Sequence, residues 1–367
     1  MKLSHSKLST ILTCPMTYYL SYIQGIKPKV EKTAFNIGSA VHWGIEHNTE
    51  DLSDYYGIDF RHKDNYTREQ MLTEAMVHGY LKNKDIIFEQ IIKTENDKNL
   101  NIVDELHEVK LTAKLKSNMY DYEHEFVGII DLLLLTDRGF VVIDYKTSSY
   151  EPNWDNYLDQ IYRYIFLLKS EFPDIPVCKI GIINIRKSNI RQKKTETEEQ
   201  FLNRLKLEYE IYDESYVVYK EFEIDKLDKT LIDEYIDNLS KMCDTADMID
   251  KNKAWYINFY AANTPYRSEY WDIFYNKPDA YLLYKINDIF FDKEDNIIKQ
   301  SRDCKPLDML TISNNNIMNH YKTFEQEIND NHININNRQL IDNMLKKYKT
   351  DKELIDNYIE VYKMLNS

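Results

Sequence analysis

The sequence predicts an α/β fold with a central sheet flanked by helices, followed by a helical C-terminal appendage. Three observations lead to this prediction. Apolar residues recur at helical spacing in several long segments, strand-like apolar runs stand between these segments, and the composition shifts after residue 280. We therefore expect one domain over residues 1–280 and a separate helical extension over residues 281–367.

The individual elements follow from local patterns in chain order. Helices are predicted at residues 6–24, 34–48, 68–94, 156–169 and about 198–207, with mostly helical structure after Lys229 and an irregular stretch at about 254–264. Strands are predicted at residues 106–115, in a hairpin over 125–149, and at 178–186 and 215–224. From about Tyr281 the chain becomes rich in asparagine, isoleucine and lysine, as in SNNNIMN and NDNHININN, which we interpret as the helical extension with polar loops.

The overall composition describes a globular protein. Hydrophobic residues make up 43% of the 367 residues and charged residues 29%, which is the balance of a chain that buries a sizeable core. No apolar run approaches the ~20 residues that a membrane span needs, and the N-terminus lacks a signal-peptide core, so we expect a cytoplasmic protein. The four cysteines show no paired spacing and are expected to be isolated, reduced thiols.

The net charge of −14 argues against a protein that coats nucleic acid, although it leaves room for a narrow basic groove. One cationic cluster stands out in IRKSNIRQKK, and its candidate nucleic-acid-binding residues are Arg186, Lys187, Arg191, Lys193 and Lys194. These side chains either contact phosphates or form a solvated surface loop. The chain has no GxxxxGK phosphate-binding loop, so it carries no recognisable nucleotide-driven motor.

The hairpin places like charges together. A tight turn at Asp137–Gly139 makes Thr136 face Gly139, and counting outward places Asp131 opposite Asp144. Asp144 and Lys146 share one face of their strand because side chains alternate. Two carboxylates across a ladder repel each other and raise each other's pKa unless a cation lies between them. A divalent metal ion would satisfy this patch.

Three further features are weak when taken singly. Gly38 and His42 are four residues apart on one predicted helix, where the glycine would allow a close backbone approach. Gln160 and Tyr164 have the same spacing on the helix after the hairpin, and Glu108 lies on the strand before it. A lone histidine or a Gln/Tyr pair is more often ordinary packing or capping than part of a catalytic site.

Taken in order, these motifs resemble a known family. GxxxH, then GxxD, then DxK after aliphatic residues, then QxxxY is similar to the PD-(D/E)xK nuclease superfamily, and most like the branch with the RecB nuclease domain and the CRISPR-associated exonucleases. The segment SKLSTILTCPMTYYLSYIQGI also resembles the opening helix of that branch, and the match extends over about residues 4–275. The resemblance implies a restriction-endonuclease-like core, with a mixed central sheet flanked by helices.

The resemblance also implies a metal centre. It assigns His42, Asp131 and Asp144 as metal ligands, together with the backbone carbonyl of Tyr145. Carboxylate oxygens suit Mg²⁺ or Mn²⁺, and an imidazole shifts the preference somewhat toward Mn²⁺. Asp131 and Asp144 would thereby also be catalytic residues.

The remaining implied roles concern the attacking water and the substrate. Lys146 would orient or deprotonate the water, and we favour positioning and charge stabilisation because a lysine among carboxylates has no reason to lose its proton. Gln160 and Tyr164 would steady the lysine and the substrate phosphate. Glu108 either supports the site from outside the ligand set or is a surface residue at a strand end.

The sequence departs from this branch in one respect. Many of its members hold an iron–sulfur cluster on one N-terminal cysteine and three distal ones. Cys14 occupies the first position, but the corresponding distal segment NFYAANTPYRSEYWDIF has no cysteine and offers Tyr266, Tyr270 and Trp271 instead. We therefore expect aromatic packing in that segment, no iron–sulfur cluster, and Cys14 as a buried structural thiol.

Three functions remain open at this point. The first is a Mg²⁺- or Mn²⁺-dependent deoxyribonuclease, an exonuclease on DNA ends or single strands, that serves replication, recombination or repair. The second is a nucleic-acid-binding subunit on the same fold that cleaves little alone and works with a helicase or recombination partner. The third is purely structural, with Asp144 and Lys146 as a buried ion pair, and it ranks last because an extra carboxylate opposite such a pair makes it costly.

Overall fold

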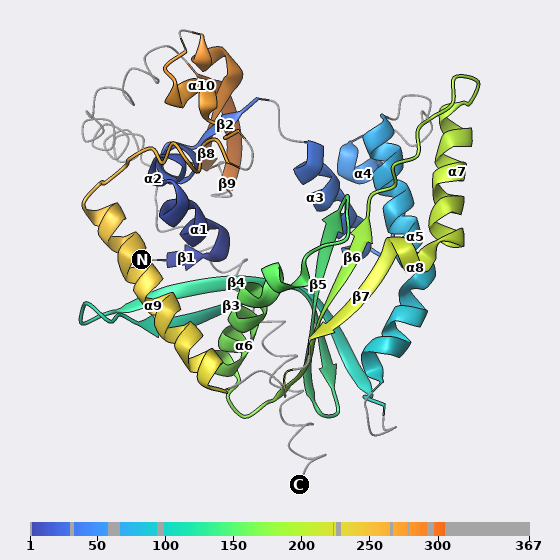
Figure 1. The fold of residues 1–367 in the computed structure, drawn as a ribbon, viewed down its shortest axis with the longest axis horizontal. Coiled ribbons are helices and arrows are strands. Elements are labelled where there is room, and N and C mark those ends of the chain that lie inside the picture. The colour runs from blue at the N-terminus through green and yellow to red at the C-terminus, as the bar shows by residue number, and fades with distance from the viewer. Residues whose placement is uncertain are drawn as a thin grey trace. The chain divides into compact units, whose positions relative to one another are not determined.

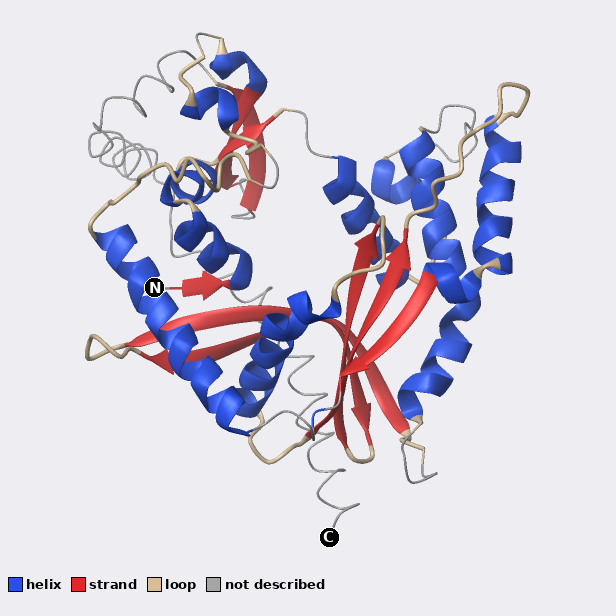
Figure 2. Cartoon of the chain, in the orientation of Figure 1, coloured by secondary structure: helices blue, strands red, loops and turns tan. Residues whose placement is uncertain are grey.

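The computed structural model describes residues 2–29, 33–57, 67–93, 99–222, 224, 229–264, 267–277, 279–291 and 297–304 (Figures 1 and 2). Among these residues the chain forms two compact units. Unit 1 comprises described residues in 2–29, 115–126 and 238–304, and unit 2 comprises those in 33–114 and 127–237. No helix of the described residues combines the length and apolar character that crossing a membrane requires.

The main sheet has six strands in the order β1-β4-β5-β6-β7, with β3 also paired to β4. The strands are β1 (Lys2–Ser4), β3 (Ile102–Lys116), β4 (Glu123–Thr136), β5 (Gly139–Ser148), β6 (Val177–Arg186) and β7 (Val217–Phe222). β5 pairs antiparallel with β4 and parallel with β6, while β7 returns antiparallel. The sheet is therefore mixed, which confirms the predicted fold class.

The helices of unit 2 cover both faces of this sheet (Figure 1). Helices α3 (Thr33–Glu46), α5 (Arg68–Ile92) and α7 (Glu198–Ile211) lie on one face, and α6 (Leu158–Glu171) lies on the other. Thr67 and Thr197 begin α5 and α7 as capping boxes, each with glutamine three residues on. Shorter helical segments are α4 (Ser53–Tyr56), η3 (Trp154–Tyr157) and α8 (Asp213–Tyr216).

The core of unit 2 lies between the sheet and helices α3, α5 and α7. Alternate residues of β4, β5 and β6 point into it, among them Leu132, Ile143 and Ile183, which are fully buried. α3 contributes Ala40 and Val41, adjacent to His42. This packing fixes the side of α3 that carries His42 relative to the ends of β4 and β5.

The hairpin has the predicted register. Thr136 pairs with Gly139 and Leu132 with Ile143, so the next step outward places Asp131 beside Asp144. Gly139 has φ +132°, and the Thr136 hydroxyl closes the turn by donating to its carbonyl oxygen at 2.7 Å. The tight turn therefore sets which carboxylates meet.

Unit 1 has a core of its own. It holds α1 (His5–Thr13), α2 (Pro15–Tyr18), a π-helical turn η1 (Tyr19–Ile23), α10 (Trp271–Phe274), η5 (Ala280–Leu283) and a second sheet of order β2-β8-β9. α9 (Lys229–Lys251) contributes residues to both units. Cys14, Tyr270 and Cys304 are buried together among the apolar side chains of this core.

The C-terminal region differs from the predicted helical extension. Strands β8 (Tyr284–Phe291) and β9 (Ile297–Asp303) pair antiparallel, and β8 also pairs with β2 (Ile26–Pro28). The described residues within 281–304 therefore belong to unit 1 and do not begin a separate helical part. The β-branched and aromatic residues of YKINDIFF favour a strand once β2 offers an edge. Residues 305–367 lie outside the described residues.

Candidate active site

The site begins with His42 on α3. Its Nδ1 lies 3.7 Å from Asp131 Oδ2, and its ring approaches the Tyr145 ring edge-on at 6.0 Å. Burial lowers the pKa of His42, while the charge of Asp144 opposes the shift and that of Lys146 adds to it. The imidazole is therefore neutral near pH 7, which is the form that binds a metal ion.

Gly38 lies one helical turn before His42, and the space around it would admit a larger residue. A methyl group added there would meet the Thr147 hydroxyl oxygen at 3.5 Å, an ordinary contact. The close backbone approach that we expected at this glycine is therefore not required by the space around it.

Asp131 on β4 is held by one strong hydrogen bond. The Tyr145 backbone N–H donates to its Oδ2 at 2.8 Å, which ties the carboxylate across the hairpin. Burial raises the pKa of Asp131, the charge of Asp144 raises it further, and the Tyr145 N–H and Lys146 only partly offset these effects, so that the pKa is about 7. A buried carboxyl in this condition gains from a nearby cation that replaces its proton.

Asp144 on β5 is the most enclosed acid of the site, with its side chain 3% exposed. Its Oδ1 accepts hydrogen bonds from Gln160 Nε2 at 2.6 Å and from the Tyr164 hydroxyl at 2.8 Å, and Gln160 also donates to Tyr164 at 2.6 Å. Burial raises the pKa of Tyr164 well above its usual value, so it remains a donor. The two α6 residues thus orient the carboxylate of Asp144.

Lys146 forms an ion pair with Asp144 Oδ2, and its ammonium lies 5.7 Å from the centre of the Tyr157 ring. The ammonium is therefore placed by an acid on its own strand and by an aromatic face from η3. Gln160 and Tyr164 contact Asp144 directly, and Asp144 in turn pairs with Lys146. Their predicted role of steadying the lysine and the substrate phosphate stays a prediction.

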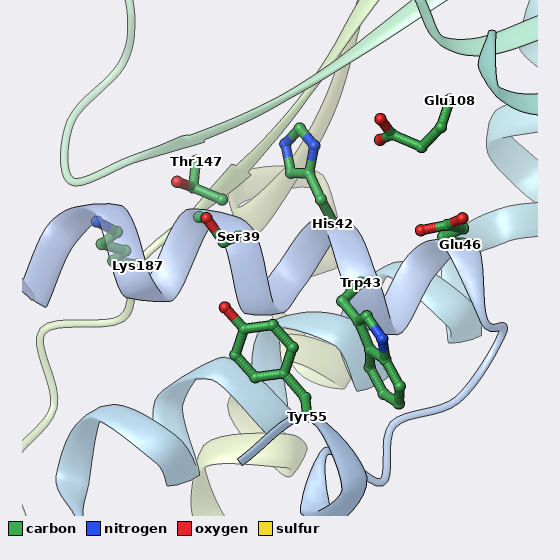
Figure 3. A pocket seen from close by; sticks show the side chains of 9 residues that line it. Ser39, His42, Trp43, Glu46, Tyr55, Glu108, Thr147 and Lys187 are labelled. Carbon is green, nitrogen blue, oxygen red and sulfur yellow. The ribbon is translucent and has the colours of Figure 1, made fainter. Parts of the chain in front are cut away.

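Glu108 on β3 joins the site through unusual backbone geometry. Its φ of +52° is in the left-handed region, which non-glycine residues seldom adopt and which often occurs at functional sites. His42, Glu108 and Asp131 each offer a ligand atom, and these three atoms lie within 4.8 Å of one another. In Figure 3 the Glu108 carboxylate points toward the His42 ring.

The donor set fits a divalent cation. One neutral imidazole and two carboxylates provide the oxygen and nitrogen ligands that suit Mn²⁺ or Mg²⁺. Burial and the charge of Asp144 raise the pKa of Asp131, and a divalent cation bound there would offset both effects. Glu108 rather than Asp144 completes the group of three, because Asp144 is turned to Lys146 and the α6 donors. Asp131 links the two groups through the hairpin register.

The predicted basic residues are distributed unevenly. Lys187 lines the pocket beside His42, whereas Arg191, Lys193 and Lys194 are exposed on the following loop. Arg186 donates to the Ser215 carbonyl oxygen at 3.3 Å and is thus engaged within the protein. The structure therefore brings only Lys187 of this cluster to the site.

The pocket itself was not predicted from the sequence. It has a volume of about 690 Å³, and its lining includes the exposed side of α3 with Ser39 and Trp43, together with Tyr55 (Figure 3). The lysine Lys187 and the acid Glu46 lie toward opposite ends of it. In the sequence Trp43 stands out only as the residue after His42, and Tyr55, which the structure places in α4, belongs to a stretch without a motif or a predicted element.

Cys14, Tyr270 and Trp271, which were considered at the positions of iron–sulfur ligands, lie in unit 1. Cys14 is buried, 5% exposed, and Tyr270 stacks on Tyr284 with ring centres 5.9 Å apart. Trp271 packs on Tyr275 at 3.9 Å and under Arg267 at 4.5 Å. Tyr266 lies outside the described residues.

We compared the chain with solved structures, curated protein sequences and protein-family models. A solved structure from Eubacterium rectale named "Putative exonuclease" is 12% identical, with a TM-score of 0.37, and the match covers 62% of this chain and 86% of that one. A structure named SSO0001 is 13% identical, with a TM-score of 0.25, over 72% and 94% of the two chains. No curated protein sequence matches. The PD-(D/E)XK nuclease superfamily matches residues 2–249, more than half of the chain, and this protein therefore belongs to that superfamily.

Proposed function

We propose that this protein is a divalent-metal-dependent deoxyribonuclease that hydrolyses phosphodiester bonds at DNA ends or in single strands, as an exonuclease in replication, recombination or repair. The observation that carries the proposal is the convergence of His42, Glu108 and Asp131 next to the Asp144–Lys146 pair. Nucleases of this superfamily use divalent metals, and the donor set here suits Mg²⁺ or Mn²⁺.

The metal site is assigned to His42, Asp131 and Glu108, with Asp144 and the Tyr145 carbonyl oxygen as further ligands. A bound Mg²⁺ or Mn²⁺ supplies a positive charge that acidifies water and offsets the charge building on the phosphate. The lowered pKa of His42 keeps its imidazole neutral and able to bind a metal ion. A bound cation would also favour the ionised form of Asp131, whose pKa is raised to about 7. Asp144, fixed by Gln160 and Tyr164, keeps its orientation throughout.

Lys146 acts on the attacking water and the phosphate. Paired to Asp144, the ammonium orients the water oxygen toward phosphorus and stabilises the extra negative charge of the transition state. The new bond joins the water oxygen to phosphorus, one ester P–O bond breaks, and the products are a phosphate monoester end and a hydroxyl end. The exposed Arg191, Lys193 and Lys194 would add weaker contacts to the backbone farther along the strand.

End-labelled single- and double-stranded DNA, incubated with Mg²⁺ or Mn²⁺, tests the proposal with wild type, Asp144→Ala and Lys146→Ala. Metal-dependent loss of full-length DNA in the wild type alone would support it. DNA binding without metal-dependent cleavage would overturn it and indicate a binding subunit that needs a helicase or recombination partner. Absence of metal uptake and of DNA binding, with a large stability loss in both variants, would indicate a structural ion pair.

A further inference from the structure

We propose that the pocket beside His42 and Glu108 binds one unstacked nucleotide of a single strand, with its base against Trp43 and Tyr55 and its phosphate at Lys187. The inference rests on the proposed nuclease function and names the substrate form that the site accepts. Such a nucleotide would lie next to two of the proposed metal ligands, since His42 and Glu108 line the same pocket.

The aromatic side of the pocket is preformed. Trp43 stacks on His47 with ring centres 4.2 Å apart and an interplanar angle of 20°, and Tyr55 lies 5.8 Å from Trp43 at 50°. Tyr55 is in turn packed edge-on against Tyr56 at 5.1 Å. Trp43 and Tyr55 are only partly buried, so the same rings that pack against the core also face the pocket. Rigid aromatic surfaces of this kind bind bases by stacking, irrespective of base identity.

Lys187 supplies the cationic end. Its backbone N–H donates to the Ser148 carbonyl oxygen at 2.7 Å, which anchors the residue at the end of β5. Burial lowers the pKa of this half-buried lysine, and no carboxylate of the described residues forms an ion pair with it. A phosphate oxygen would provide the missing counter-charge.

The distribution of charge sets the orientation of the nucleotide. Lys187 lies toward one end of the pocket, while Glu46 and Glu108 lie toward the other (Figure 3). A phosphate is therefore attracted to the lysine end and repelled from the acidic end, where a metal ion would be attracted. The hydroxyls of Ser39 and Thr147 line the space between them and offer hydrogen bonds to the sugar.

The size of the pocket suits one nucleotide. Its volume of about 690 Å³ lies within the ~300–1,000 Å³ of typical small-ligand sites. In a duplex each base is stacked on both sides and paired, so its face is not available to Trp43 and Tyr55. The pocket therefore favours single strands and frayed ends over intact duplex.

A metal-free binding experiment tests the proposal on the full chain in EDTA, where cleavage cannot occur. Fluorescence anisotropy would compare three labelled probes of equal length: oligo-dT, an abasic strand with the same phosphates, and a duplex. The variants are Trp43→Leu and Tyr55→Leu, which keep apolar volume without an aromatic face, and Lys187→Ala. Tyr212→Ala, which removes an aromatic side chain 57% exposed at the end of α7, is the matched control. Circular dichroism checks that each variant folds.

We expect wild type to bind oligo-dT more tightly than the abasic strand and the duplex. Trp43→Leu should weaken oligo-dT binding about five- to tenfold, as loss of one base–aromatic stack predicts, and leave the abasic strand unaffected. Tyr55→Leu should show the same selectivity with a smaller loss. Lys187→Ala should weaken both single-stranded probes, and Tyr212→Ala should weaken neither.

Equal losses on oligo-dT and abasic probes, wild-type binding by Trp43→Leu, or no binding of oligo-dT by the wild type would overturn the base pocket. Cleavage in Mn²⁺, measured separately, distinguishes this failure from that of the nuclease proposal. Persistent cleavage, together with a Trp43→Leu variant that loses affinity equally for oligo-dT and the abasic strand, rejects the pocket and retains the nuclease. Base-selective binding without any metal-dependent cleavage retains the pocket and rejects the nuclease.

Discussion

Asp131 in unit 2 and Asp244 in unit 1 are both enclosed carboxylates, but their surroundings shift their pKa values in opposite directions. Asp244 on α9 is 0% exposed and accepts hydrogen bonds from the Ser117 hydroxyl at 2.6 Å, the His124 ring at 2.7 Å and the Asn118 backbone N–H at 2.9 Å. Burial alone would raise the pKa of Asp244, but these donors outweigh it and lower the pKa.

Asp131 lacks comparable support. It has one backbone donor at 2.8 Å, a neutral imidazole at 3.7 Å and another carboxylate on the adjacent strand, so burial and the charge of Asp144 raise its pKa to about 7. The difference shows how to separate structural from functional acids. A buried carboxylate surrounded by donors stabilises the fold, whereas one left beside another acid is suited to bind a cation.

The largest effect is expected for cleavage. Asp144→Asn keeps the size of the side chain but removes the charge beside Lys146 and the proposed metal site, and it should lower the single-turnover cleavage rate by about 10³-fold, equivalent to roughly 4 kcal/mol. Asp244→Asn should leave the rate of folded protein within a few-fold of wild type. A loss of less than tenfold in Asp144→Asn, or an equal loss in both variants, would place the chemistry elsewhere.

Stability should show the reverse order. Asp244→Ala leaves the donors of Ser117, His124 and Asn118 without their acceptor and should lower the free energy of unfolding of unit 1 by about 3 kcal/mol. Asp131→Asn removes a charge that burial disfavours and should leave metal-free stability unchanged or higher at pH 8. Thermal melts in EDTA measure both, and a lower melting temperature for Asp131→Asn than for Asp244→Ala would contradict the comparison.

The pH dependence of these two effects should have opposite signs. The pKa of Asp131 is raised by folding, so its contribution to stability is present below the unfolded pKa of about 3.9 and is lost as pH rises through about 7. The pKa of Asp244 is lowered, so its contribution is present above about 3.9 and is lost as pH falls through the folded pKa.

In melts without metal from pH 3 to 8, the advantage of Asp131→Asn over wild type should therefore grow toward pH 8. The deficit of Asp244→Ala should shrink toward pH 3. Parallel trends for the two variants would show that hydrogen bonding does not distinguish these acids.

The Asp131 side of this contrast could be predicted from the sequence, and for local reasons. The turn at Asp137–Gly139 determines the hairpin register, and the two-residue alternation of a strand then places Asp131 beside Asp144. The four-residue spacing of Gln160 and Tyr164 similarly places both on one side of α6, where both contact Asp144.

The rest depends on contacts between distant segments. Glu108 lies near His42 and Asp131 because its backbone is in the left-handed region. The sequence does not indicate this conformation, since the residue is neither glycine nor asparagine. Tyr55 meets Trp43 only because the chain after α3 folds back. β8 forms a strand where helix was predicted, because β2, more than 250 residues earlier, supplies its partner edge. Asp244 likewise bonds to Ser117 and His124, which are 127 and 120 residues away in the sequence.

The smallest expected effect tests whether Glu108 belongs to the metal site. Glu108→Gln removes one charged ligand atom of the group of three and should weaken Mn²⁺ binding about tenfold without abolishing it. Calorimetric titration measures the change, with the exposed Glu46→Gln on the pocket rim as a matched acid control. Equal affinities for wild type and Glu108→Gln would assign Glu108 to fold support alone.

The most direct test is a Mn²⁺ titration of wild type, Asp131→Asn and Asp244→Asn, followed by calorimetry at pH 8, where Asp131 carries its charge. If Asp131 is a metal ligand and Asp244 is a structural acid held by hydrogen bonds, wild type and Asp244→Asn should bind Mn²⁺ with similar affinity. Asp131→Asn should then bind Mn²⁺ at least a hundredfold more weakly. Mn²⁺ bound equally well by Asp131→Asn would contradict the account.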